Sequence, residues 1–71
     1  MPLVDAGIGP VADLLSKVFG WTVDPNGLAT MKLEHRLEII HAGVEIAISK
    51  EDDVATDVLF DQYRLLSKSL G

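Results

Sequence analysis

The stretch that decides the fold is residues 28–48, which reads LATMKLEHRLEIIHAGVEIAI. At about 100° per residue, a helix over this stretch is apolar on two sides. One stripe consists of Leu33, Leu37, Ile40, Val44 and Ala47, and the opposite side carries Leu28, Met31, Ile39, Ala42 and Ile46. A helix that packs on a single neighbour needs only one apolar stripe. The pattern therefore favours a helix inside a bundle, to which a second copy or a partner protein contributes.

The size and composition of the chain also point to association. A chain of 71 residues builds a barely adequate core, and chains of this size usually add disulfides, a metal or oligomerisation. There is no cysteine, which excludes disulfides and thiolate metal sites and fits a reducing compartment. With 48% hydrophobic residues, the chain is typical of a folded domain. We expect a single small helical domain over residues 1–71 that forms an oligomer.

The charge pattern disfavours several classes of partner. The net charge is −5, and the six basic residues are scattered: Lys17, Lys32, Arg36, Lys50, Arg64 and Lys68. Without a basic cluster, neither nucleic acid nor an anionic lipid surface is an expected partner. No uncharged stretch approaches the ~18–20 residues of a membrane span, and the start lacks signal-peptide features. We expect a soluble cytoplasmic or intracellular protein, or one that lies within a virion or other assembly.

The first third of the chain predicts an arm, a short helix and a turn. Residues 1–9 show no periodicity and are interpreted as an extended arm. Pro10 is well placed as the first residue of an amphipathic helix over 10–19, which Gly20 ends in a left-handed conformation. The sequence TVDPNG at 22–27 then predicts a turn, because Asp-Pro and Asn-Gly both favour turns.

A further helix is expected over residues 50–70, with Ser49 as its N-cap. It too has two apolar sides: Ala55, Leu59, Leu66 and Leu70 on one, and Val54, Val58 and Leu65 on the other. The predicted fold is therefore all-α: a short N-terminal amphipathic helix, then a long antiparallel helical hairpin over 28–48 and 50–70, completed as a bundle by oligomerisation. One continuous helix through Ser49 is the structural alternative, since no Gly or Pro breaks the chain there.

The first functional hypothesis is a non-enzymatic structural or interaction protein. It would act as a homo-oligomer or as a small subunit of a larger assembly, without metal or cofactor. Ile39, Ile46 and Phe60 are expected to pack on another chain, and Phe19 and Trp21 to anchor an interface. No nucleophile–base arrangement or Gly-rich phosphate loop indicates catalysis.

An alternative is a metal-binding helical bundle formed across subunits. Glu38 and His41 have the E-x-x-H spacing of ferritin-like di-iron bundles, and Glu34 and Glu45 lie on the same helical face. A symmetric dimer would assemble iron or manganese ligands from Glu34, Glu38 and His41, with Asp57 or Asp61 as the bridging carboxylate. A solvated polar face accounts for the same residues.

A second alternative is an acidic inhibitor or adaptor that binds a basic partner surface. Asp53, Asp57 and Asp61 form a ladder at i+4 spacing. Such a ladder also stabilises the start of a helix through the helix dipole. Binding through it would weaken strongly with salt.

The opening layout resembles the start of some small phage-encoded lysis-module proteins. The likeness lies in the amphipathic segment over 9–18, the D-P-N turn at 24–26 and the charged Leu/Glu-rich segment over 32–38, less than half of the chain. Those proteins continue into membrane-spanning helices, which are not expected here. The resemblance therefore implies a protein of a compact phage-type genome and not a lysis role.

Overall fold

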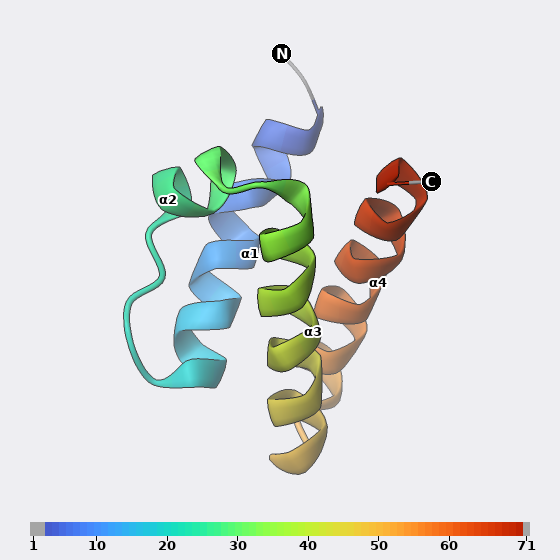
Figure 1. Ribbon diagram of the computed structural model, residues 1–71. Coiled ribbons are helices and arrows are strands. Elements are labelled where there is room, and N and C mark those ends of the chain that lie inside the picture. The colour runs from blue at the N-terminus through green and yellow to red at the C-terminus, as the bar shows by residue number, and fades with distance from the viewer. Residues whose placement is uncertain (1–2, 71) are drawn as a thin grey trace.

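The chain folds into four helices: α1 (Leu3–Phe19), α2 (Pro25–Thr30), α3 (Leu33–Ser49) and α4 (Asp53–Leu70). The structure is a computed structural model that describes residues 3–70 and, for residues 3–7, the backbone alone. α4 returns antiparallel to α3, α1 lies beside them, and α2 lies near the end of the molecule where α1 and α3 begin (Figure 1). The predicted all-α class is confirmed. Completion of a bundle by a second chain stays a prediction.

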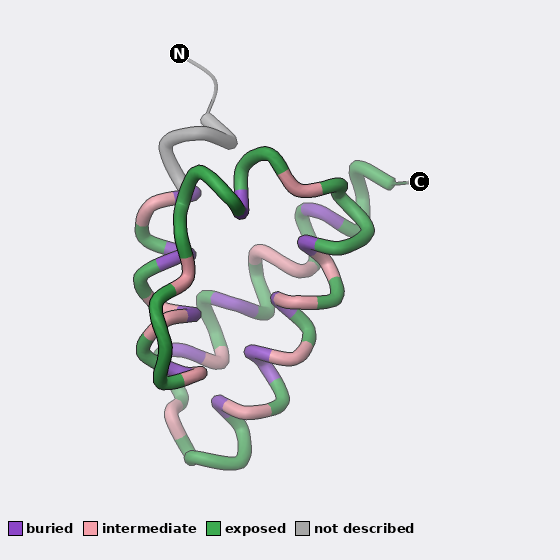
Figure 2. Tube along the Cα trace, turned by 60° about the vertical axis from the view of Figure 1, so that its left-hand side comes forward, coloured by how far each residue is buried: buried purple, intermediate pink, exposed green. Residues whose placement is uncertain are grey.

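One core joins all four helices. The four largest fully buried side chains come one from each helix: Leu15, Leu28, Ile40 and Leu59. Each contributes about 1.5–3 kcal/mol when fully removed from water. Buried residues recur along the inward sides of the helices, while the connections between helices are mostly exposed (Figure 2).

The extended arm predicted for residues 1–9 is wrong for residues 3–9, which form the first turns of α1. The apolar stripe of the helix continues one turn upstream, because Ile8 is buried together with Val11, Ala12 and Leu15. Pro10 lies inside the helix on its exposed side. Residues 1–2 lie outside the described residues. At the other end Gly20 has φ 86°, as the prediction of a left-handed stop requires.

The helix predicted over 28–48 is in fact two helices that meet at Met31 and Lys32. Both residues are extended, with ψ 148° and 144°. The buried guanidinium of Arg36 donates to the carbonyls of Leu28 (Nε, 3.1 Å) and Ala29 (Nη2, 2.9 Å). In a continuous helix those carbonyls would accept from the amides four residues later. Arg36 therefore stabilises the break.

The predicted turn at 22–27 is also partly helical, because α2 begins within it. Asp24 is the N-cap, and its carboxylate accepts from the amides of Asn26 and Gly27. Pro25 occupies the first helical position, where its missing N–H costs no intrahelical bond. The Asp-Pro dipeptide thus starts a helix instead of closing a turn.

The predicted boundary at Ser49 is wrong by three residues, and the continuous-helix alternative is wrong as well. Ser49 is the last residue of α3, and Glu51 adopts φ 58°. The amide of Asp52 donates to Ala47 and that of Glu51 to Ile48, the bond pattern of a Schellman motif. Asp52 then caps α4 by accepting from the amide of Ala55 at 3.1 Å.

The second apolar face of α3 is partly covered within the chain itself. Ile39 and Ile46 are half-buried and pack against the core. Gly43 permits a close approach of helices: a Cβ there would lie 2.6 Å from Leu15 Cδ2 and 3.2 Å from Leu59 Cδ1. The two-faced pattern of α3 therefore reflects packing on α1 and α4, and does not by itself require a second chain.

Among residues 3–70, no helix is both long enough and apolar enough to cross a membrane.

Candidate interaction surfaces

An apolar groove lies between the segment that follows α1 and one side of α3. It is shallow, with a volume of about 470 Å³, and its lining is mostly apolar. The lining residues are Phe19, Trp21, Thr22, Val23, Glu38, Ile39 and Ala42. Three of the predicted interface residues, Phe19, Trp21 and Ile39, thus line one surface. We call it the Trp21 groove.

Hydrogen bonds hold in place the segment after α1, which forms one wall of the Trp21 groove. Gly20 turns the chain at the end of α1, and the amide of Val23 donates to Ser16 Oγ at 2.8 Å. Ser16 Oγ in turn donates to the carbonyl of Ala12 at 2.7 Å. Lys50 Nζ also donates to the carbonyl of Val18 at 2.8 Å, which ties the end of α1 to the end of α3. These hydrogen bonds fix the position of the loop that forms this wall.

Trp21 is the most prominent side chain of this groove. Its ring stacks on Phe19, with centroids 4.8 Å apart and planes 11° from parallel. The side chain is nevertheless 63% exposed. Exposed tryptophan rings are costly to hydrate and are enriched at the centres of protein interfaces.

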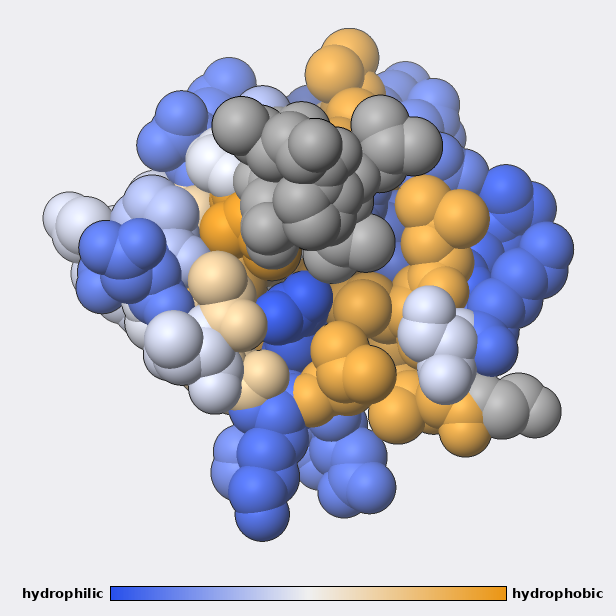
Figure 3. All heavy atoms as spheres, turned by 90° about the horizontal axis from the view of Figure 1, so that it is seen from above, coloured by the Kyte–Doolittle hydropathy of each residue, from blue (hydrophilic) through white to orange (hydrophobic). Residues whose placement is uncertain are grey.

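A second exposed apolar surface runs along α4. Val54, Val58 and Leu65 lie on one side of the helix and are exposed, Val54 at 73%. This is the second apolar side predicted for the last helix, and within the described chain no helix covers it. Apolar side chains are also visible at the end of the molecule where α3 begins and α4 ends (Figure 3). Leu33 and Leu70, the first residue of α3 and the last of α4, are exposed there.

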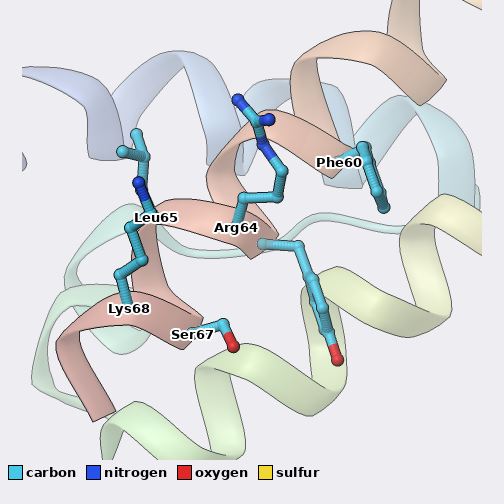
Figure 4. Close-up of a pocket in the computed structure, with 6 residues that line it drawn as sticks. Phe60, Arg64, Leu65, Ser67 and Lys68 are labelled. Carbon is cyan, nitrogen blue, oxygen red and sulfur yellow. The ribbon is translucent and has the colours of Figure 1, made fainter. Parts of the chain in front are cut away.

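Phe60 lies on another side of α4 from this stripe. It stacks parallel to Tyr63 at a centroid distance of 6.5 Å, and Tyr63 contacts the ring of His41 on α3 at 5.6 Å. Phe60 and Arg64 project from α4 beside a depression of about 260 Å³ (Figure 4). The five predicted interface residues are therefore divided: Phe19, Trp21 and Ile39 share the groove, Phe60 is exposed on α4, and Ile46 is half-buried against the core.

The residues of the metal hypothesis are not brought together in one chain. Glu34, Glu38 and His41 are exposed on α3, and His41 Nε2 lies 3.6 Å from Glu45 Oε1. Asp61 on α4 instead pairs with Arg64 at 2.9 Å. Among residues 3–70 there is no group of three or more His, Asp or Glu side chains close enough to hold a metal ion. A site for iron or manganese between subunits stays a prediction.

Sequence reasoning missed two residues on which these surfaces depend. Arg36 is a buried charge that positions the start of α3, and Gly43 is the point of closest approach between helices. Gly43 was itself a signal in the sequence, because a glycine inside a helical pattern costs about 1 kcal/mol relative to alanine and indicates a packing reason. Comparisons of the chain with protein-family models, curated proteins and solved structures find no match.

Proposed function

We propose that this protein is a non-enzymatic structural protein that acts by binding other polypeptide chains, as a homo-oligomer or as a small subunit of a larger assembly. The Trp21 groove is the surface that receives an apolar segment of a neighbouring chain. Its volume is within the range of about 300–1,000 Å³ that is typical of small-ligand pockets in proteins.

The observation that carries the proposal is the exposure of Trp21. A large ring that is 63% exposed forgoes the favourable free energy of removing its apolar surface from water, and it is held in that position by stacking on Phe19. The ring stands next to a groove lined by Ile39 and Ala42. An exposed anchor beside an apolar groove is the arrangement that binding hot spots have in protein interfaces.

A blocked amino acid tests the groove without knowledge of the partner. We expect N-acetyl-leucinamide, titrated into ¹⁵N-labelled protein, to shift the amide signals of Thr22, Val23 and Ala42 and the indole signal of Trp21. At a gain of about 0.3 kcal/mol per heavy atom, the lower figure for ligand efficiency, the affinity is millimolar. N-acetyl-glycinamide, which lacks the apolar side chain, should leave the same signals unchanged.

Two variants distinguish binding in the groove from non-specific binding to other exposed apolar side chains. Trp21→Ala removes the aromatic ring that lines the groove. It should weaken probe binding about fivefold or more, which corresponds to a loss of about 1 kcal/mol of binding free energy. Ile48→Ala removes another exposed apolar side chain, outside the groove, and should leave probe binding unchanged. Shifts that are spread over the whole surface, or that survive Trp21→Ala, would count against the groove.

Native mass spectrometry of the purified chain then addresses the assembly. A mass above the 7.7 kDa of one chain indicates a homo-oligomer. A monomer whose groove binds the probe assigns the groove to a different protein of the assembly. A monomer whose groove binds no probe contradicts the proposed function.

A further inference from the structure

The outward face of α4 offers a continuous surface for a partner. Val54, Val58 and Leu65 follow at i, i+4 and i+11, so they lie within about 40° of one another around the helix axis. All three are exposed, whereas Leu59 and Leu66 on the other apolar side are buried in the core. We call these three residues the α4 stripe.

A strip of charged residues borders the α4 stripe. Asp57, Asp61, Arg64 and Lys68 are all exposed and fall within about 60° of one another on the same flank of the helix. Asp61 pairs with Arg64 in the same helix at 2.9 Å. Asp57 and Lys68 form no ion pair within the described chain. Along α4 the strip is acidic in its first half and basic in its second.

We propose that a second copy of the chain occupies this face, with the two α4 helices packed antiparallel about a two-fold axis. A two-fold axis in the contact plane, at right angles to both helices, reverses one helix and brings the same flank of each together. The acidic half of each charged strip then lies beside the basic half of the other. The apolar stripe and the charged strip are thereby both self-complementary.

One register satisfies both charge pairs. Positions 57 and 68 share their midpoint with positions 61 and 64. A single axis at that midpoint places Asp57 beside Lys68 of the second copy, and Asp61 beside Arg64 of the second copy. In the same register Val58 is offset from Leu65 of the second copy by two residues, or about 3 Å along the axis, so the two side chains interleave.

The charged strip changes from negative to positive along α4, and this change favours an antiparallel second copy over other partners. A uniformly basic helix would attract Asp57 and Asp61 but would meet like charge at Arg64 and Lys68. A parallel second copy, related by a two-fold axis along the helices, would place the two charged strips on opposite sides of the contact, where acid and base do not meet. Of these three arrangements, the antiparallel copy matches the charge at every position. The inference concerns a surface separate from the Trp21 groove and does not depend on it.

Exchange of the charges at positions 57 and 68 tests the pairing by sedimentation equilibrium of the full chain. Wild type is expected to form a dimer of about twice the 7.7 kDa monomer mass. Asp57→Lys or Lys68→Asp alone sets like charges together twice in a two-fold dimer, and should raise the dimer Kd about tenfold or more. The double variant Asp57→Lys/Lys68→Asp restores opposite signs and should return the Kd to within about threefold of wild type.

Glu45→Lys is the matched control, since Glu45 is an exposed acid on α3 and the change in charge equals that of Asp57→Lys. Both variants reduce the net charge of −5, which by itself would favour association. A Kd raised by Asp57→Lys and not by Glu45→Lys supports the pairing. Circular dichroism melts establish that each variant is folded.

Three results would overturn the inference: a wild-type chain that stays monomeric at millimolar concentration, single variants that leave the Kd unchanged, or a double variant that does not regain dimerisation. None of these results bears on the binding of N-acetyl-leucinamide in the Trp21 groove. Failure of the α4 pairing is thus distinguishable from failure of the proposed function.

Discussion

The two joints that flank α3 end a helix by different means. At the α2–α3 joint, Met31 and Lys32 are extended and the carbonyls left behind are bound by the buried side chain of Arg36. At the α3–α4 joint, backbone amides satisfy the last carbonyls of α3 through the left-handed Glu51, and Asp52 caps the next helix. Neither joint contains glycine or proline.

The α2–α3 joint thus depends on one buried side chain, whereas the α3–α4 joint depends on hydrogen bonds of the local backbone. Arg36 acts across seven and eight residues. Without it the carbonyl of Ala29 loses its donor, and that of Leu28 keeps only the 3.4 Å bond from the amide of Met31. The bonds at the α3–α4 joint span at most five residues and come from the main chain, which substitution does not remove. We therefore expect the first joint to be far more sensitive to mutation than the second.

Arg36→Met should have the largest effect. Methionine retains the apolar stem but donates to neither carbonyl, which leaves Ala29 without a donor and Leu28 with the amide of Met31 alone. Loss of a donor to a buried acceptor costs about 1–3 kcal/mol. We expect the free energy of unfolding to fall by about 1–3 kcal/mol, as measured by urea denaturation. Arg36→Lys should lie between methionine and wild type, because an ammonium lacks the planar fork that reaches both carbonyls. Equal stability of all three chains would show that the joint does not depend on the guanidinium.

Gly43→Ala tests whether the two joints hold α3 as close to its neighbours as the structure indicates. A Cβ at this position would lie 2.6 Å from Leu15, a fully buried side chain with little room to move. Overpacking of this kind costs about 1–3 kcal/mol, against the gain of about 1 kcal/mol that alanine normally brings to a helix. Thermal denaturation should therefore show a lower Tm.

Gly9→Ala is the matched control for this substitution. Gly9 is also helical, and a Cβ there would meet none of the described atoms within 4 Å. It should raise the Tm through helix propensity alone. The same sign of change at positions 9 and 43 would mean that the helices are not in close contact at Gly43.

Much of the fold was predictable from local patterns in the sequence. The all-α class, the stop at Gly20 and the buried side of α4 follow from helical periodicity and from the freedom of glycine at positive φ. The predicted start of the last helix was three residues too early, because Ser49 and Asp52 are both good N-cap residues. The left-handed conformation of Glu51 ends α3 and leaves Asp52 as the N-cap.

The parts that could not be predicted depend on contacts between distant residues. Arg36 looks like a solvated base in the sequence, and only the position of α2 supplies the carbonyls that bury it. The bond from Lys50 to the carbonyl of Val18 likewise joins residues 32 positions apart. Phe19, Trp21 and Ile39 were each predicted from the sequence as interface residues, which stays a prediction. That the three residues line one groove was not predictable, because this requires both the turn at Gly20 and the break before α3.

Asp52→Ala should weaken the α3–α4 joint by a smaller amount than Arg36→Met weakens the other. The substitution removes the carboxylate that accepts from the amide of Ala55, and loss of an N-cap costs about 1 kcal/mol. The backbone bonds of the joint remain. Hydrogen exchange should speed up at the first turn of α4 and stay unchanged in α2. Asp52→Ser, which preserves a capping oxygen, should restore most of the loss.

Glu51→Gly should strengthen the α3–α4 joint, and it has the smallest expected effect. Glu51 is the one non-glycine residue at positive φ in the described chain, and an L-residue in that conformation costs about 1 kcal/mol. Glycine removes this cost but adds entropy to the unfolded chain, so we expect a net gain of about 0.5 kcal/mol in urea denaturation. Ser49→Gly, two residues earlier and helical, should lower stability instead. Opposite signs at positions 49 and 51 would establish the left-handed turn, whereas two losses of similar size would indicate that α3 runs on through Glu51.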